Sequence, residues 1–261
     1  MNDPYRPGTP CWIDLMVPDQ QAAIDFYCDL FGWQGEAGPA EHGGYAVCTL
    51  KGKPVAGIMK AMNPDGTVPD PMPPAEWTTY LSTDAIDAAL TSVTDAGGTV
   101  VVPPMDVMDL GRMAVFADPA GAVFGLWQPG TFAGAGIVNE HGALVWSELT
   151  TPDPDEASAF YSAALPVTAT PSEMEGADGY VEFQVDGRAV GGMMDMSKLP
   201  PGVSPHWQPY FAVDSVDDIQ SAAVRAGATV LAPAFDMVAG RMAVLADPQG
   251  GAFSVIAPKM S

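Results

Sequence analysis

Hydrophobic residues follow two different spacings along the chain, and the switch between them recurs. A strand-like run at 12–17 leads into Asp19, a residue type that caps helices well, and apolar side chains then recur at helical spacing from Ala23 to Phe31. The same pattern returns with Asp153, where Pro154 occupies the favoured first helical position. Short alternating runs follow each helix and predict strands. The pattern therefore predicts a βαβββ module at each place.

Two further modules have the same order of signals. A short strand precedes Asp84 and another precedes Asp214, and each is followed by apolar residues at helical spacing. Gly97 is a suitable stop for the first of these helices. We therefore predict an α+β fold that uses the βαβββ module four times.

The chain also contains an internal duplication. Four blocks recur in one order: 11–27 with 145–161, 44–59 with 179–194, 76–90 with 206–220, and 111–127 with 240–256. The repeats predict two tandem domains, at 5–130 and at 140–258, joined by a glycine-rich linker at 129–142.

Composition narrows the class of protein. Among 261 residues there are 10 Lys and Arg against 32 Asp and Glu, for a net charge of −22, which argues against a nucleic-acid partner because phosphates require a basic surface. No apolar run is long enough to span a membrane, and the first residues do not resemble a secretory signal. The three cysteines form no disulfide framework. We therefore expect a cytoplasmic protein with neither membrane nor nucleic acid as partner.

Repeated motifs carry a resemblance to a known family. A D-P-x-G turn occurs at 118–121 and at 247–250, each time after G-R-M and four further residues, and W-x-D/E-L openings and a W-x-x-Y strand also occur twice. The chain thus resembles the vicinal oxygen chelate superfamily of glyoxalases, extradiol dioxygenases and bleomycin resistance proteins, and within it the actinobacterial two-domain glyoxalase-like proteins. The resemblance implies mixed sheets curled into cups that hold a ligand.

The resemblance also implies where a metal ion would bind. In metal-dependent members, His on first strands and Glu on last strands hold the ion. The equivalent positions here carry no good ligand and are Trp12, Thr78, Trp146 and Gln208 on first strands, and Gly57, Gly125, Gly192 and Ser254 on last strands. We therefore expect no metal and no other cofactor, which disfavours glyoxalase I and dioxygenase chemistry.

Histidine leaves one alternative open for a metal. Of His42, His141 and His206, only His206 is expected at the mouth of a strand. It could combine with Asp14 or Glu148 in an unusual site, or be an ordinary residue at the end of a strand.

Strand alternation predicts what lines the cups. If Trp12 points inward, so does Asp14, while Ile13, Leu15 and Val17 pack beneath the helix. The expected ligand-binding residues combine aromatic rings, polar groups and one carboxylate in each half: Trp12, Asp14, Thr78, Tyr80, Arg112, Arg241, Trp127, Trp146, Glu148, His206, Gln208 and Tyr210. Such a lining suits a flat organic molecule stacked on tryptophan. Alternatively, the tryptophans fill the cups as core.

Asp14 and Glu148 need partners if they are buried. Arg112 and Arg241 recur at equivalent positions and could form salt bridges with them. Alternatively, one of the carboxylates is a general base, with Tyr80 or Tyr210 as the acid.

Three functions follow from these observations. The first is a metal-free protein, monomeric or homodimeric, that binds a small, aromatic molecule. The second is a glyoxalase-type lyase or isomerase acting on small carbonyl compounds, or an accessory to a hydroxylase of an antibiotic pathway. The third is an interaction protein or antigen whose cups are filled.

Overall fold

The computed structural model describes residues 5–63 and 67–259, and its α+β architecture confirms the prediction. The first module contains β1 (Pro10–Val17), α1 (Gln20–Phe31), a 3-10 turn (Ala40–His42), β2 (Ala46–Leu50) and β3 (Lys53–Lys60). The second contains β4 (Glu76–Ser82), α2 (Ile86–Asp95), β5 (Thr99–Val107), β6 (Gly111–Ala117) and β7 (Val123–Pro129).

The second half repeats this order. The third module contains β8 (Leu144–Thr151), α3 (Pro154–Ala164), β9 (Thr168–Pro171), β10 (Val181–Val185), β11 (Arg188–Asp195) and a 3-10 turn (Met196–Lys198). The fourth contains β12 (His206–Ala212), α4 (Val216–Arg225), β13 (Thr229–Met237), β14 (Gly240–Ala246) and β15 (Ala252–Pro258).

The first module departs from the predicted βαβββ order. In place of a full strand after α1 it has a single bridge between Gln34 and Thr49. The segment that follows contains Gly35, Gly38 and Pro39, residue types that disfavour a strand interior. The other three modules contain all three strands after the helix.

The four helices begin where the sequence pattern predicts, but their N-caps differ. Asp19 accepts a hydrogen bond from the Ala22 amide and Asp153 accepts one from Glu156, so both are N-caps. Asp84 and Asp214 precede helices without capping them. The cap of α4 is Ser215, while α2 begins after Ala85, whose side chain has no oxygen to offer.

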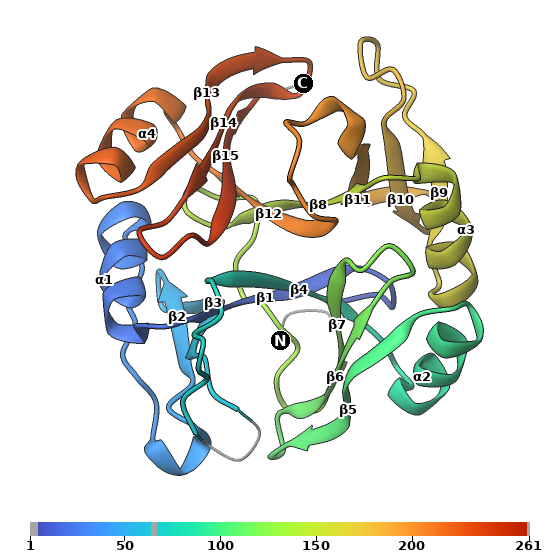
Figure 1. Cartoon of the computed structure of the whole chain (residues 1–261), viewed down its shortest axis with the longest axis horizontal. Helices are drawn as coiled ribbons and strands as arrows, with labels where there is room; N and C mark the ends of the chain where they lie inside the picture. Colours follow the sequence, from blue (N-terminus) through green and yellow to red (C-terminus); the bar gives the residue numbers. More distant parts are fainter. Residues whose placement is uncertain (1–4, 64–66, 260–261) are drawn as a thin grey trace. The chain divides into compact units, whose positions relative to one another are not determined.

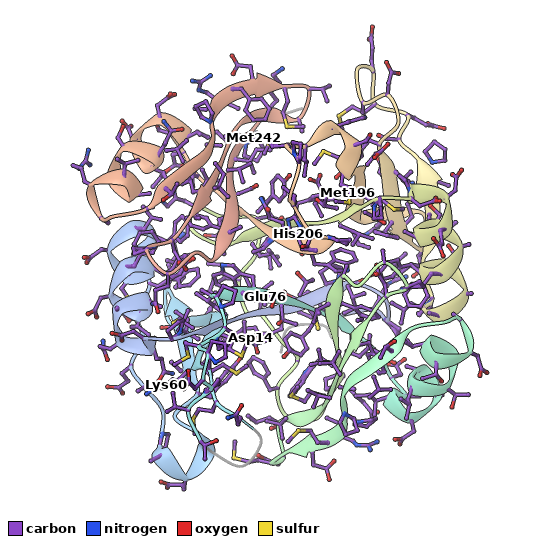
Figure 2. The ribbon with its side chains drawn as sticks, viewed as in Figure 1. Asp14, Lys60, Glu76, Met196, His206 and Met242 are labelled. Atoms are coloured by element: carbon purple, nitrogen blue, oxygen red, sulfur yellow. The ribbon has the colours of Figure 1, made fainter. Side chains whose placement is uncertain are left out.

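Two mixed sheets contain these strands (Figure 1). Their orders are β2-β3-β1-β4-β7-β6-β5 and β13-β14-β15-β12-β8-β11-β10-β9, and neither order closes on itself. In both sheets the first strand of a module pairs in parallel with the last strand of that module, as β1 does with β3 and β8 with β11. Asp14 on β1 and His206 at the start of β12 are labelled in Figure 2.

The chain divides into two compact units that do not coincide with the two halves of the duplication. Unit one contains residues 1–12, 78–134 and 146–208, and unit two contains residues 13–77, 135–145 and 209–261. In unit one α2 packs with α3, and in unit two α1 packs with α4. Each unit therefore builds its core with helices from both halves.

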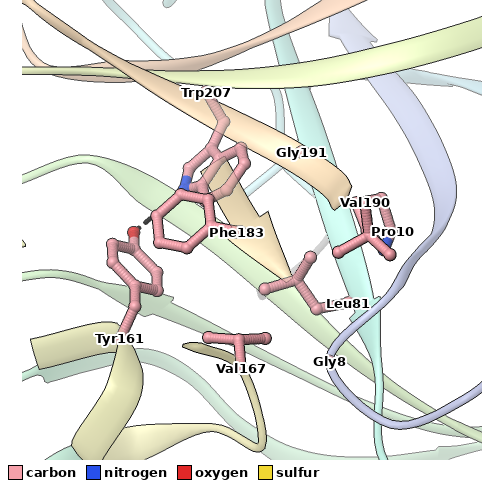
Figure 3. A pocket seen from close by; sticks show the side chains of 9 residues that line it. All are labelled: Gly8, Pro10, Leu81, Tyr161, Val167, Phe183, Val190, Gly191 and Trp207. Carbon is pink, nitrogen blue, oxygen red and sulfur yellow. Dashed lines mark hydrogen bonds between the residues drawn. The ribbon is translucent and has the colours of Figure 1, made fainter. Parts of the chain in front are cut away.

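A buried Trp–Tyr–Asp hydrogen-bond chain occurs in each unit. In unit one the Trp207 indole donates to the Tyr161 hydroxyl (2.9 Å; Figure 3), which donates to Asp118 (3.1 Å). The corresponding chain of unit two runs through Trp77, Tyr27 and Asp247. Burial raises the pKa values of Tyr27, Tyr161 and Asp118. This hydrogen-bond chain explains why the Trp, Tyr and Asp residues of the motifs recur in both halves. Each of them provides a hydrogen-bond partner for the buried polar group of another.

Beside this chain lies a small gap in the core of unit one. It is lined mainly by apolar side chains, including Leu81, Val167 and Phe183 (Figure 3), and its volume is about 10 Å³. A volume of this size holds at most a single water molecule. The gap is therefore a packing defect and not a ligand pocket.

Candidate functional site

The first strand of each half presents alternate residues to opposite faces. Ile13, Leu15 and Val17 lie in the apolar core with the residues of α1, as the alternation predicts. Asp14 lies on the other face of β1, and Glu148 is its counterpart on β8. Both carboxylates are buried, with exposures of 4% and 7%. A buried carboxylate is costly without hydrogen bonds, so the side chains that bind Asp14 and Glu148 define the candidate site.

Glu148 is held by two aromatic residues of unit one. The Tyr180 hydroxyl donates a hydrogen bond of 2.8 Å to Glu148 Oε2, and the Trp146 indole N–H donates one of 2.8 Å to the Tyr180 hydroxyl. Burial and the nearby carboxylate raise the pKa of Tyr180 well above its ordinary value. The tyrosine therefore remains a protonated donor, and the three side chains form one chain of hydrogen bonds.

A glycine makes room for this tyrosine. Gly192 on β11 lies in register with Glu148, and a Cβ atom there would be 1.9 Å from the Tyr180 hydroxyl oxygen. Atoms cannot approach so closely, so the position requires glycine. Tyr180 is not among the site residues predicted from the sequence, although the repeated Gly-Tyr that begins the second duplicated block contains it.

A second carboxylate lies in the same row of the sheet. Glu182 on β10 is in register with Gly192 and is partly buried. Its two oxygens accept hydrogen bonds from Ser172 (2.7 Å) and from Gln184 (3.3 Å). Glu182 also contributes to the raised pKa of Tyr180, which is consistent with the two side chains lying close together.

Unit two contains the corresponding arrangement around Asp14. The Tyr45 hydroxyl donates a hydrogen bond of 3.2 Å to Asp14 Oδ2. Gly57 lies in register with Asp14, and a Cβ atom there would be 1.8 Å from the Tyr45 hydroxyl oxygen. Beside Gly57, however, the next strand carries Val47, which is 42% exposed, where the other half has Glu182.

Trp12 and Trp127 meet in unit one through a residue of the predicted linker. The Phe132 ring makes edge contacts with both indoles, at centroid distances of 5.0 Å to Trp12 and 6.0 Å to Trp127. The Trp127 indole N–H also donates to the Phe132 carbonyl oxygen (2.9 Å). Both tryptophans are buried. Phe132 is not among the site residues predicted from the sequence, because it lies in a segment without hydrophobic periodicity.

The two arginines do not pair with Asp14 or Glu148, which corrects that expectation. Arg112 binds Asp87 and Asp106, with a shortest distance of 2.7 Å. Arg241 binds Asp217 and Asp236 in the same way. Each arginine joins the first turn of a helix to a neighbouring strand near the surface. A long charged side chain keeps its charged end in solvent more easily than it brings that end to a buried carboxylate.

The remaining predicted residues occupy several surroundings. The His206 ring is within hydrogen-bond distance of the Ser204 carbonyl and of the Gln208 amide oxygen. Tyr80 is buried in register with Gly125, and a Cβ there would be 2.1 Å from its ring. Tyr210 is buried in register with Ser254, and Thr78 is partly buried on β4. His141 binds Asp214 in unit two, and the side chain of His42 lies outside the described residues.

A catalytic metal ion does not fit the residues at the expected positions. Three of the four last-strand positions are glycine, and aromatic side chains fill the space that a ligand there would need. Within residues 5–63 and 67–259, no three His, Cys, Asp or Glu side chains come together closely enough to hold an ion. Trp, Thr and Gly do not supply the imidazole and carboxylate donors that a divalent metal prefers.

The four-module fold and this paired arrangement define a glyoxalase-type protein. A model of the glyoxalase/bleomycin resistance protein/dioxygenase superfamily matches residues 11–126, and a glyoxalase-like domain model matches residues 146–256. The chain belongs to this superfamily.

Curated relatives match over nearly the whole length. The chain is 44% identical to proteins named "Putative glyoxylase CFP32" from Mycobacterium bovis and Mycobacterium tuberculosis, covering 97% of this chain and 96% of the relative. It is 38% identical to the anthracycline biosynthesis protein DnrV of Streptomyces peucetius, covering 97% and 94%.

Solved structures show the same fold at low sequence identity. A Mn(II)-bound glyoxalase from Novosphingobium aromaticivorans matches with a TM-score of 0.64 at 17% identity, covering 97% of this chain and 82% of that one. The 2,3-dioxygenase LapB from Pseudomonas sp. KL28 matches with a TM-score of 0.60 at 17% identity, covering 97% and 92%. Among the described residues, no helix has the length and apolar character needed to cross a membrane.

Proposed function

We propose that this chain binds a planar aromatic molecule on the face of the third module that carries Trp146, without a metal ion. The observation that carries the proposal is the hydrogen-bond chain from Trp146 through Tyr180 to Glu148. It fixes the orientation of an indole that remains partly exposed. A rigid aromatic surface loses little conformational entropy when a flat ligand stacks on it.

The polar groups beside Trp146 indicate what the ligand must offer. Glu148 and Glu182 are acceptors of hydrogen bonds when ionised, so a complementary ligand carries donors such as phenolic hydroxyls or an amine. The net charge of −22 disfavours anionic ligands. A neutral or cationic aromatic compound with hydroxyl or amino substituents meets these conditions.

The relatives support this class of ligand. Two of them, from Streptomyces peucetius and from Streptomyces sp. strain C5, are named as anthracycline biosynthesis proteins, with identities of 38% and 37%. Anthracyclines are polycyclic aromatic compounds, and the proposed surface suits such a ring system. We propose no metal at this site because Trp146 and Gly192 occupy the positions expected to supply ligands. Among the described residues, moreover, no three His, Cys, Asp or Glu side chains come together closely enough to hold an ion.

Tryptophan fluorescence provides the test, with 1,8-dihydroxyanthraquinone as the probe. We expect saturable quenching in the wild type and an affinity about tenfold weaker in Trp146→Ala, because loss of one stacking surface costs about 1.4 kcal/mol. The matched control is Trp12→Ala, which we expect to keep the wild-type affinity. Addition of Mn²⁺ or Zn²⁺ should leave the affinity unchanged.

Two results would overturn the proposal. One is binding that survives in Trp146→Ala at the wild-type affinity. The other is binding that requires an added metal ion.

A further inference from the structure

We infer that Phe132 is a built-in occupant of an aromatic site between Trp12 and Trp127, and that this site accepts a free single-ring aromatic molecule when Phe132 is removed. The inference concerns a different surface of unit one from the Trp146 site. Only the contrast between the covered Trp12 and the partly exposed Trp146 rests on the proposed function.

The ring of Phe132 has the contacts expected of a bound aromatic ligand. Its planes meet those of Trp12 and Trp127 at 88° and 77°, the edge-to-face geometry that aromatic pairs prefer. Trp12 and Trp127 are only 5% and 7% exposed. The ring of Phe132 is therefore a partner of both indoles.

Backbone hydrogen bonds hold the segment that carries this ring. The amides of Gly130 and Phe132 both donate to the Leu110 carbonyl, at 2.8 and 3.0 Å, and the Thr131 amide donates to Asp109 (3.0 Å). The segment therefore remains anchored if the Phe132 side chain is shortened.

Gly134 brings the same segment close to β1. Its φ angle is +119°, and a Cβ atom there would lie 2.3 Å from the carbonyl oxygen of Cys11. Only glycine adopts this conformation at such a short separation. The segment that carries Phe132 is thus held by hydrogen bonds to Leu110 and Asp109, and it then passes close to the backbone of Cys11.

Trp146 provides the contrast within unit one. Among the described residues, no aromatic ring packs against its indole, which keeps its partial exposure. The chain therefore covers the tryptophan face of its first half with its own phenyl ring, while the equivalent tryptophan of its second half has no such cover.

Removal of the ring gives a direct test. Because Phe132 is partly exposed, Phe132→Ala leaves an apolar notch the size of a phenyl ring beside two buried indoles. Benzene can take the edge-to-face position of the lost ring in that notch. We expect this variant to melt at a lower temperature than the wild type. Benzene at about ten times its dissociation constant should then raise the melting temperature by about 3 °C. Phe132→Leu, which keeps the space filled, is the matched control and should not respond.

The outcomes separate this inference from the proposed function. If benzene leaves folded Phe132→Ala unchanged, or stabilises the wild type and Phe132→Leu equally, the inference is wrong. If Phe132→Ala does not fold by itself, its recovery of a cooperative melting transition in the presence of benzene, again compared with Phe132→Leu, provides the same test. Benzene rescue without dihydroxyanthraquinone binding to the wild type would overturn the proposed function alone, and the opposite pair of results would overturn this inference alone.

Discussion

Trp12 and Trp146 occupy equivalent positions in the two halves, but their surroundings differ. Trp12 is 5% exposed and in contact with Phe132, whereas Trp146 is partly exposed and donates its N–H to Tyr180. Position in the repeat therefore determines which side chain faces the sheet surface. Non-repeated residues, such as those of the linker, determine whether that surface is closed.

A second pair of sites shows what the halves still share. Asp14 and Glu148 each accept a hydrogen bond from a tyrosine hydroxyl, and each tyrosine lies above a glycine. This shared part is required for packing. The differences lie beside it, where Val47 in one half replaces Glu182 in the other. We expect binding to follow the differences and stability to follow the shared part.

The largest effect is expected from filling the glycine positions. Gly57→Ala and Gly192→Ala would each place a Cβ within 2 Å of a tyrosine oxygen, at 1.8 and 1.9 Å. Either the backbone shifts or the tyrosine leaves its buried carboxylate. We expect each to lower the free energy of unfolding by about 2–4 kcal/mol, measured by urea denaturation. Only Gly192→Ala should also abolish binding of dihydroxyanthraquinone. Equal loss of binding in both would show that the halves are not functionally distinct.

A smaller effect is expected from exchanging the residues that differ. Glu182→Val removes one hydrogen-bond acceptor in register with Gly192 and should weaken dihydroxyanthraquinone binding about fivefold, as loss of about 1 kcal/mol implies. Val47→Glu is the matched change on an exposed position of the other half and should leave the affinity unaltered. Calorimetric titration measures both. Unchanged affinity in Glu182→Val would remove this carboxylate from the site.

The pH dependence should distinguish Tyr180 from an exposed tyrosine. Because burial raises its pKa, ionisation is opposed in the folded state. Its contribution to stability is therefore present below the ordinary tyrosine value of about 10 and declines as pH rises above it, since only the unfolded chain ionises readily there. When the pH is raised, tyrosinate absorbance should show that Tyr180→Phe lacks one of the tyrosines that ionise only well above a pH of about 10. Titration of Tyr180 at the ordinary tyrosine pKa would contradict its enclosure between Trp146 and Glu148.

The smallest effect is expected from the arginines. Arg112→Gln and Arg241→Gln remove ion pairs with helix carboxylates and touch neither Glu148 nor Trp146. We expect less than about a twofold change in ligand affinity, because exposed ion pairs contribute little. A tenfold loss of ligand affinity in either variant would show that the arginine belongs to the binding site.

The fold was largely accessible from the sequence, because repeats, caps and alternation are local signals. Asp19 and Asp153 cap helices as predicted, and Ile13 and Leu15 pack beneath α1. The candidate site was harder to predict from the sequence than the fold. Phe132 reaches two tryptophans only because the linker is anchored by hydrogen bonds far from it in sequence, and periodicity gives no signal for such a path.

Tyr180 was missed for a related reason. It lies just before β10, outside the alternating strand pattern, and the space for its hydroxyl comes from a glycine on another strand. The prediction that Arg112 and Arg241 pair with Asp14 and Glu148 was wrong, because such pairing depends on distances in the folded structure that the sequence pattern does not contain. Local patterns therefore predicted the scaffold, while the closing of its surfaces depended on contacts between distant segments.

A crystal structure of the chain with 1,8-dihydroxyanthraquinone tests the central claim most directly, because it locates the ligand against one tryptophan or the other. We expect the ring system to lie on Trp146, with a hydroxyl group directed toward Glu148 or Glu182, while Phe132 keeps its contacts with Trp12 and Trp127. A ligand that displaces Phe132 and leaves Trp146 exposed would contradict the account.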